Sequence, residues 1–278
     1  SVRSLIVVSI STSPTINTIS NQSLCTNTAT TAINFSGNGL AVYNWTNSTP
    51  SIGLAANGTG NISSFTALNS GSLPVTATIT ATPVSSGYAY IANYGVFPFP
   101  AGNTISVINT TTNIVVGSIT VGSNPFGVAI TPDGTKVFVT NYGSNNVSVI
   151  NTATNTVIAT ITVGSQPQGI VLSPDGTKAY VANQSIIGIG SVSVINTATN
   201  TVAATITVGY QPQGLAISPD GSRVYVANVN SNNISVINTT TNTVSTTIGV
   251  GTQPICVGIS PDGSKLFVPN FGNNNVSV

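Results

Sequence analysis

The chain has 278 residues, of which 40% are hydrophobic and only 3% are charged: five are Lys or Arg, four are Asp or Glu, and none is His. About a quarter of the residues of an ordinary soluble domain are charged, so this composition excludes histidine-based acid–base catalysis and metal sites built from clustered imidazoles and carboxylates. The net charge of +1 excludes the basic footprint that nucleic acid requires, and no apolar run is long enough to span a bilayer.

The first predicted element is a strand over residues 1–12. Its apolar residues alternate as in a strand, and it lacks the long apolar core of a signal peptide. Two interpretations stay open. The strand is the last one of a preceding sandwich, or it is exchanged between subunits and completes a neighbouring copy.

Residues 13–85 are predicted to form a β-sandwich. Strand-like runs, among them a late strand over Pro74–Thr82, alternate with turns rich in Asn, Gly and Ser. The run Asn21–Cys25, together with Tyr43–Thr46, resembles Ig-like and PKD-like repeats of large bacterial surface proteins. This resemblance implies a sandwich with Trp45 in its core.

The two cysteines, Cys25 and Cys256, are far apart in the chain and fall in different predicted domains. Two cysteines do not make a disulfide framework. We expect either two buried, unreactive thiols or a bridge between subunits.

Residues 86–278 contain a repeat. The sequence Pro-Asp-Gly-Thr/Ser-Lys/Arg occurs four times, with its Asp at positions 133, 175, 220 and 262. An Ile-Asn-Thr motif recurs with the same spacing of 42, 45 and 42 residues, its Asn at positions 109, 151, 196 and 238. Each period reads as four strands, two of which pair around the Pro-Asp-Gly turn. Four short strands in a period of this length are typical of a β-propeller blade.

The second strand of the period carries a family resemblance. Phe138–Asn141, Tyr180–Asn183 and Tyr225–Asn228 each follow a Pro-Asp-Gly turn and resemble the YVTN repeat of β-propellers from microbial surface layers and other secreted proteins. Tyr90–Asn93 begins an earlier copy, which carries an insertion over Val96–Gly102. The resemblance implies an extracellular, all-β protein. The repeat contains five copies of the second strand, five of the third and four each of the first and fourth, which predicts about five partial four-stranded blades, arranged as a closed ring, an arc or a fragment.

Eight of the nine charged side chains lie in the repeated turns, and we expect a structural role for them. The Asp and the Lys or Arg of one turn are three residues apart and can pair, although an exposed pair adds only about 0–1 kcal/mol. A ring of four carboxylates around a cation is the alternative, which we disfavour because each blade is expected to hold its turn apart from the others. The turn residues are Asp133, Lys136, Asp175, Lys178, Asp220, Arg223, Asp262 and Lys265.

No catalytic, metal-binding or cofactor-binding residue is predicted. A serine or threonine nucleophile needs a base, and none exists outside the turns. We therefore expect no enzyme activity and no cofactor.

Asn-X-Ser/Thr sequons are frequent, and an extracellular protein can carry glycans at such sites. In a chain this rich in Asn, Ser and Thr, many of them also arise by chance. The candidate glycosylation sites are Asn21, Asn34, Asn44, Asn47, Asn57, Asn61, Asn109, Asn146, Asn183, Asn233, Asn238 and Asn275.

These features predict an extracellular structural or adhesive protein that forms or decorates a cell-surface layer or filament. Its expected partners are copies of itself, through strand exchange or edge pairing, and surface glycans, but neither nucleic acid nor a membrane. The alternative is a carbohydrate- or protein-recognition module displayed on the cell surface, in which exposed rings and neighbouring Asn residues hold the ligand. The candidate rings are Tyr94, Tyr142, Tyr210 and Phe271.

Overall fold

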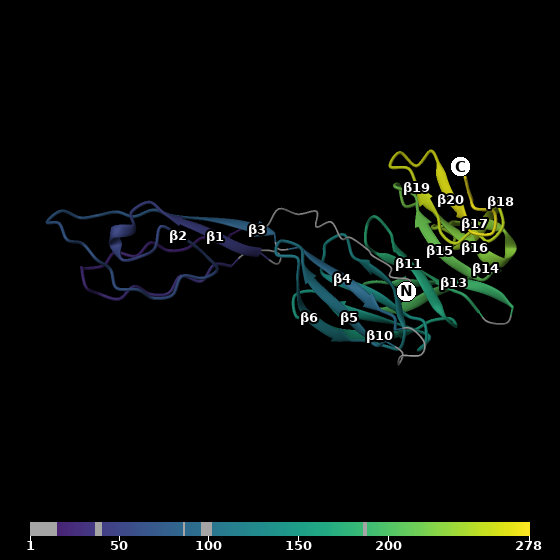
Figure 1. The fold of residues 1–278 in the computed structure, drawn as a ribbon, viewed down its shortest axis with the longest axis horizontal. Coiled ribbons are helices and arrows are strands. Elements are labelled where there is room, and N and C mark those ends of the chain that lie inside the picture. The colour runs from purple at the N-terminus through teal and green to yellow at the C-terminus, as the bar shows by residue number, and fades with distance from the viewer. Residues whose placement is uncertain (1–15, 37–40, 86, 96–101, 186–187) are drawn as a thin grey trace. The chain divides into compact units, whose positions relative to one another are not determined.

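The computed structural model describes residues 16–36, 41–85, 87–95, 102–185 and 188–278 (Figure 1). The described residues fall into two compact units, which divide between Gly87 and Tyr88. The strand predicted over residues 1–12 lies outside the described residues. The fold is all-β, and neither of its two short helical turns has the length to cross a bilayer.

The first unit contains one three-stranded antiparallel sheet in the order β2-β1-β3. Its strands are β1 (Ala41–Asn47), β2 (Asn57–Thr59) and β3 (Ile79–Ser85), with a helical turn η1 (Pro50–Ile52) after β1. The late strand begins at Ile79 and not at Pro74 as predicted, because its partner β1 ends at Asn47, directly opposite Ile79.

The core of the first unit surrounds Trp45, as the Ig-like resemblance implies for this residue. Trp45 lies opposite Gly58 in the β1–β2 register. A Cβ at Gly58 would lie 2.3 Å from Cζ2 of the indole, so the ring covers the glycine directly. The other buried members of this core are Phe35, Tyr43, Leu54 and Ile62.

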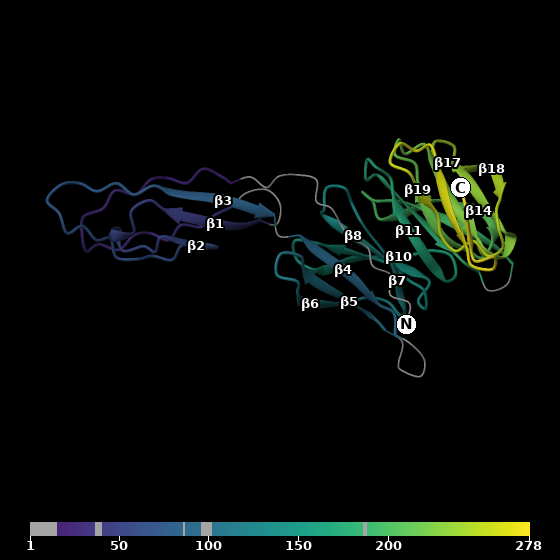
Figure 2. The ribbon, with the colours of Figure 1, turned by 45° about the horizontal axis from the view of Figure 1, so that its top comes forward.

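The second unit consists of five antiparallel sheets, which we call blades one to five in chain order (Figures 1 and 2). The middle three blades have four strands, and the described residues give the first and the last blade three strands each. The predicted numbers of strands, five second and third strands and four first and fourth strands, are confirmed. The bounds in blades one and two are β4 (Tyr88–Asn93), β5 (Thr104–Asn109), β6 (Ile114–Thr120), β7 (Pro125–Ile130), β8 (Lys136–Asn141), β9 (Asn146–Asn151) and β10 (Thr156–Thr162).

The last three blades repeat this pattern. The bounds are β11 (Pro167–Leu172), β12 (Lys178–Asn183), β13 (Ile189–Asn196), β14 (Thr201–Tyr210), β15 (Pro212–Ile217), β16 (Arg223–Asn228), the helical turn η2 (Val229–Ser231), β17 (Asn233–Asn238), β18 (Thr243–Gly249), β19 (Gly258–Ile259), β20 (Leu266–Asn270) and β21 (Asn275–Ser277).

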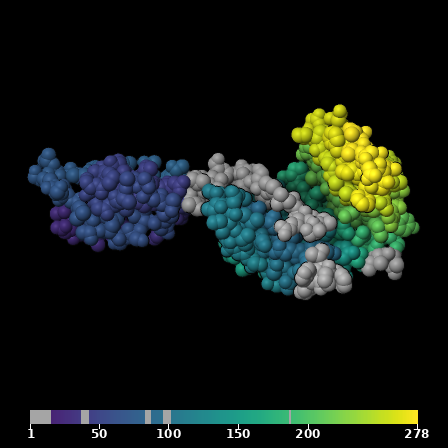
Figure 3. Space-filling model, in the orientation of Figure 1, coloured from purple at the N-terminus to yellow at the C-terminus, as the bar shows by residue number. Residues whose placement is uncertain are grey.

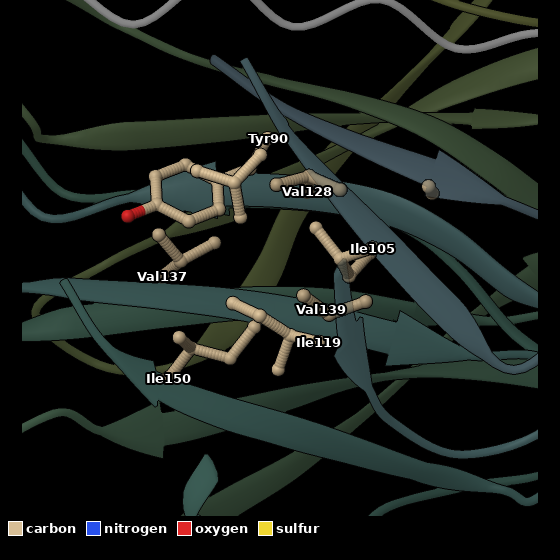
Figure 4. Close-up of a cluster of buried hydrophobic side chains, with 9 residues drawn as sticks. Tyr90, Ile105, Ile119, Val128, Val137, Val139 and Ile150 are labelled. Atoms are coloured by element: carbon tan, nitrogen blue, oxygen red, sulfur yellow. The ribbon is translucent and has the colours of Figure 1, made fainter. Parts of the chain in front are cut away.

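Four apolar cores hold the second unit together, each between two successive blades. In β8, Val137 and Val139 pack toward blade one (Figure 4), whereas Phe138 packs toward blade three. A strand that is buried on both faces reads as a continuous apolar run, which explains the sequence of the second strands. In the space-filling view the colour passes from teal to yellow across adjoining blades (Figure 3). Among the described residues, no core joins blade one to blade five.

Each blade has two ends of different composition. Because the strands are antiparallel, the turns between first and second and between third and fourth strands lie at one end, the turn face. The loops between second and third strands and between successive blades lie at the other end, the loop face. All eight charged residues of the five blades lie in or directly after the first-to-second turns, so the described residues of the loop face include no charged side chain.

Each of the four fourth strands contains a β-bulge. In blade two the bulge interrupts the regular alternation of side chains between the two faces of the strand over residues 157–163. In blade two the register shifts between Val157 and Ala159, so that Ile158 is the extra residue. The same shift occurs in the other three fourth strands. A bulge re-aims side chains and ends regular pairing at an edge, and both Val157 and Ile158 are exposed as a result.

Candidate functional site

The turn face is organised around its carboxylates. In blade two, Oδ1 of Asp133 accepts hydrogen bonds from Oγ1 of Thr131 at 2.6 Å and from the backbone N–H of Thr135 at 3.0 Å. The turns at Asp175, Asp220 and Asp262 repeat this arrangement with their own Ser or Thr residues. Each carboxylate is therefore a hydrogen-bond acceptor inside its own turn.

These hydrogen bonds change the acidity of the turn. Hydrogen bonds from Ser218 and Ser222 lower the pKa of Asp220 to about 2. Those from Ser260 and Ser264 do the same for Asp262. Both carboxylates stay ionised at any physiological pH, which suits a structural acceptor and not a general acid.

The two remaining carboxylates shift in the same direction. Hydrogen bonds from Ser173 and Thr177 lower the pKa of Asp175. At Asp133, burial raises the pKa, but the hydrogen bonds from Thr131 and Thr135 outweigh it, so that the pKa is lowered.

The predicted pairing of Asp with Lys inside one turn is wrong for Lys136 and Lys178, which contact the next blade instead. The ammonium of Lys136 donates to the carbonyl oxygen of Thr197 in blade three at 2.7 Å, and Lys178 donates to Thr239 in blade four at 2.8 Å. Each lysine begins a second strand, which packs against the next blade, while the carboxylate of its turn is already engaged by hydroxyl groups.

Successive turns also touch, contrary to the expectation that the blades hold them apart. A Cβ on Gly176 would lie 2.9 Å from Cδ of Pro132 in the preceding turn, and one on Gly221 would lie 3.1 Å from Cδ of Pro174. Even so, no three acidic or cysteine side chains come together among the described residues.

The asparagine that ends each second strand clamps the blade from inside. Asn183 is 1% exposed, and its Nδ2 donates to the hydroxyl groups of Ser191 at 3.1 Å and Ser193 at 2.9 Å on β13. Its equivalents in the other blades are Asn93, Asn141, Asn228 and Asn270, and we call all five the clamp asparagines. Each donates twice through Nδ2 to its own third strand: Asn93 to two hydroxyl groups, and the other three to one hydroxyl group and one Asn Oδ1.

The candidate glycosylation sites fall into three groups. Asn47 and Asn183 are buried and donate hydrogen bonds through Nδ2, the atom that a glycan would modify. The half-buried sequon residues are Asn109, Asn146, Asn233 and Asn238. The exposed ones are Asn21, Asn34, Asn44, Asn57, Asn61 and Asn275.

Both cysteines are exposed and unpaired, so the expectation of buried thiols is wrong. Cys25 lies in an irregular segment, which leaves it at the surface. Cys256 precedes the short strand β19, and partial burial raises the pKa of its thiol.

The loop face has a frame that repeats from blade to blade. The residue before each first-strand proline has a left-handed backbone, with φ between 51° and 54° at Asn124, Gln166, Gln211 and Gln253. Its carbonyl oxygen accepts a hydrogen bond from the residue after the clamp asparagine, as in Phe271 N–H to Gln253 at 2.9 Å. The backbone N–H of Gln253 also donates to Oδ1 of Asn232 in blade four at 2.9 Å. Each connection between blades is thus fixed to two neighbouring loops.

The position after the clamp asparagine varies, although the frame does not. It holds the rings Tyr94, Tyr142 and Phe271 in blades one, two and five, and Gln184 and Val229 in blades three and four. The Tyr94 ring lies 6.1 Å from that of Tyr142 and 5.9 Å from that of Phe126, both in edge-on contact. Two of the four candidate rings therefore meet in one cluster.

A hollow on the same face is lined by the loop that contains Phe271 and by the η2 turn, which the backbone of Tyr210 contacts. The hollow has a volume of about 450 Å³ and is lined by Val229, Asn230, Asn232, Thr252, Gln253 and Gly272. Phe271 precedes Gly272 and is 70% exposed, and Tyr210, whose N–H donates to Ser231 Oγ at 2.8 Å, is 49% exposed. Both rings were candidates from the sequence, but the lining amides were not. The three loops that carry these amides come together only when the blades pack side by side.

Comparison with known proteins adds the following. Residues 186–276 match the family model of YNCE-like β-propellers. No curated protein matches the chain. Among solved structures, hydrazine synthase of Kuenenia stuttgartiensis is similar, with 17% identity over 68% of this chain and 91% of that chain and a TM-score of 0.33. The family match and the repeated four-stranded sheets together support a β-propeller in the second unit.

Proposed function

We propose that the chain is an extracellular structural or adhesive protein that assembles with copies of itself into a surface layer or filament. The observation that carries the proposal is the outer rim of the second unit, where apolar side chains are exposed on edge strands without a charged residue. In blade one, Ile114, Val115 and Val116 are 60%, 59% and 54% exposed.

Edge strands usually carry charges or bulges that prevent association. The fourth strands of this protein have only the bulge, because every charged residue of the five blades lies at the turn face. The bulge shortens the ladder available for pairing, but it also turns neighbouring apolar side chains outward. An exposed apolar patch of this kind marks an interaction surface, and we propose that it contacts the same rim of a second copy.

A non-catalytic role is supported by the state of the carboxylates. Each of the four accepts hydrogen bonds within its own turn. These contacts make the four carboxylates acceptors inside the turns, which supports a structural role for them and not a role as general acid or base.

The finer assignments are part of the same proposal. The recurring clamp asparagine and Pro-Asp-Gly turn support a YVTN-type propeller, and the burial of Trp45 beside Tyr43 supports an Ig-like or PKD-like first unit. Extracellular placement is supported by the low charge and by the exposed sequon residues, since glycans at Asn57 or Asn61 would give the surface solubility that charge does not.

The test is the assembly state of the full-length chain. We expect ordered polymers in negative-stain images and a large species in light scattering. The Val115→Lys variant should disperse them, because it places a charge in the apolar rim, whereas Thr243→Lys adds the same charge to an exposed polar position of β18 and should not. A wild-type chain that stays monomeric at all concentrations would refute the proposal.

A further inference from the structure

We infer that the hollow between blades four and five on the loop face binds a neutral carbohydrate. This inference names a ligand class for the adhesive role proposed above and rests on it. The hollow is lined by three loops, the η2 turn with Asn230 and Asn232, the connection with Thr252 and Gln253, and the β20–β21 loop with Gly272.

The backbone of the hollow is held in place without the ligand. The N–H of Gly272 donates to the carbonyl of Thr252 at 3.0 Å, and the N–H of Gln253 donates to Oδ1 of Asn232 at 2.9 Å. Asn232 itself ends η2 in the left-handed conformation, with φ of 53°. A frame that is already ordered loses little conformational entropy when a ligand binds.

The frame leaves amide groups free to contact a ligand. The side chains of Asn230 and Gln253 are exposed, and within the described part of the chain neither makes a hydrogen bond. Each primary amide offers two donors and one acceptor oxygen. A sugar hydroxyl group is both a donor and an acceptor, so it can bond to either end of such an amide.

We expect a neutral ligand because the residues that line the site carry no charge. Every charged residue of the five blades lies at the opposite, turn face, and an anionic or cationic ligand would lose its hydration without gaining a counter-charge. Nucleotides, phosphorylated lipids and charged peptides are thereby disfavoured relative to a neutral sugar.

Two exposed aromatic residues are joined to the loops of the hollow: Phe271 directly precedes Gly272, and the N–H of Tyr210 donates to Oγ of Ser231 in η2. Phe271 is 70% exposed and Tyr210 is 49% exposed. The C–H groups on one face of a pyranose ring form an apolar surface that packs on an aromatic ring, and recognition sites commonly combine such rings with a few well-placed polar groups. The combination of exposed rings and free amides separates this site from an apolar protein-docking patch.

The repeat supplies an internal comparison. The same frame exists between blades two and three, where the N–H of Gln166 donates to Oδ1 of Asn145 at 2.8 Å. There the position equivalent to Phe271 is Gln184, whose side chain is engaged by Gln168 at 2.8 Å. Variation on a constant loop face is typical of the binding surface of repeat proteins, and here it distinguishes the hollow at blades four and five from its counterpart at blades two and three.

The experiment is a titration of the full-length chain with a panel of neutral hexasaccharides of glucose, mannose, xylose and N-acetylglucosamine, and of hexagalacturonate as the charged control. Binding is measured by calorimetry, and the site is located from shifts of the side-chain amide signals of Asn230 and Gln253. We expect at least one neutral hexasaccharide to bind and hexagalacturonate not to bind.

Two variants test the contacts. Phe271→Ala and Gln253→Ala should each weaken binding about tenfold, equivalent to about 1.4 kcal/mol. The matched control is Phe267→Ala, which removes an aromatic ring 42% exposed on β20 of the same blade, away from the loop face; it should leave the affinity unchanged.

Three results would overturn the inference: no binding to any neutral member, full affinity in both variants, or shifts confined to the Tyr94 and Tyr142 cluster. Light scattering on the same samples reports assembly separately. If polymers form but no sugar binds, this inference fails while the structural role proposed above stands.

Discussion

The ammonium of Lys136 donates a hydrogen bond to the carbonyl oxygen of Thr197, 61 residues further along the chain and one blade away. The hydroxyl of Thr197 in turn donates to the carbonyl of Gly176, in the Pro-Asp-Gly turn of its own blade, at 2.6 Å. Lys178, Thr239 and Gly221 repeat the same chain of contacts one blade later. Two of the five basic residues of this protein, Lys136 and Lys178, thus connect neighbouring blades.

Removing this contact should loosen the packing between blades. We expect Lys136→Met or Lys178→Met to lower the free energy of unfolding of the second unit by about 1 kcal/mol, because each removes a charge-assisted hydrogen bond to a carbonyl group while keeping the apolar stem. Lys265→Met is the matched control, since Lys265 is exposed, and it should have no effect.

The measurement is urea unfolding followed by far-ultraviolet circular dichroism. The single Trp of the chain lies in the first unit, so its fluorescence reports that unit separately and should not change. Equal stability of the Lys136 and Lys265 variants would contradict the role assigned to Lys136.

The clamp asparagine should contribute more than an asparagine in an exposed turn. Asn183→Ala removes both donors to Ser191 and Ser193 and leaves a buried hydroxyl unpaired, so we expect a loss of about 2 kcal/mol. Asn196 is exposed, and its Oδ1 accepts from the backbone N–H groups of Ala198 and Thr199. Because water can replace those contacts, Asn196→Ala should cost about 0.5 kcal/mol. Urea unfolding of the two variants measures both losses of unfolding free energy. Similar losses would contradict the stabilising role assigned to the clamp asparagine.

The first-strand glycines permit close approach of successive blades. A Cβ on Gly169 would lie 2.4 Å from the carbonyl oxygen of Gln213, and one on Gly127 would lie 2.4 Å from that of Gln168. The added Cβ would meet the backbone of the next blade, which cannot move aside as a flexible side chain can. Gly169→Ala should therefore lower the free energy of unfolding by about 3 kcal/mol. Gly117→Ala on β6 meets nothing within 4 Å and should be neutral in the same unfolding assay. If both variants unfold at the same urea concentration, the close approach has no energetic importance.

Below about pH 8, stability should depend on pH only in acid. The pKa of Asp220 and of Asp262 is about 2 in the folded chain, against an ordinary value of 3.8. A carboxylate whose pKa is lowered by folding stabilises the folded state above its ordinary pKa, and this contribution is lost as the pH falls from about 4 toward 2. With no His in the chain, we expect a constant melting temperature between about pH 5 and 8 and a decline below about pH 4.

The pH prediction has its own control. Asp262→Asn cannot ionise at position 262, so its melting temperature should decline less steeply below about pH 4 than that of the wild type. Calorimetric scans across the acid range measure both proteins. A wild-type melting temperature that rises on acidification would contradict the sign of these pKa shifts.

Much of the fold could be predicted from particular residues. Asp133, Asp175, Asp220 and Asp262 marked the turns and their period, and the apolar runs after them marked the second strands. These features are local, because a turn or a strand is specified by residues close together in the chain. The bulge at Ile158 escaped prediction because an extra residue in a strand is defined by its partner strand.

The candidate site was predicted only in part. Four aromatic residues were named as candidate rings: Tyr94, Tyr142, Tyr210 and Phe271. The contact of Tyr94 with Tyr142 could not be predicted, because it depends on loops from different blades. The same holds for the hollow. Asn230 and Gln253 gave no signal of their own in a chain rich in amides. The variation of residues after the clamp asparagine was the one feature of the sequence that pointed to the loop face.

By itself the sequence determined the all-β character of the chain, its repeat, and the placement of nearly every charge in one kind of turn. Only the tertiary structure decided the partners of these groups: the lysines contact the next blade, Asn47 and Asn183 are buried, and the cysteines are exposed. The physical reason is that spacing along the chain sets which residues share a strand or turn, whereas burial and hydrogen bonding between blades depend on how separate sheets pack in space.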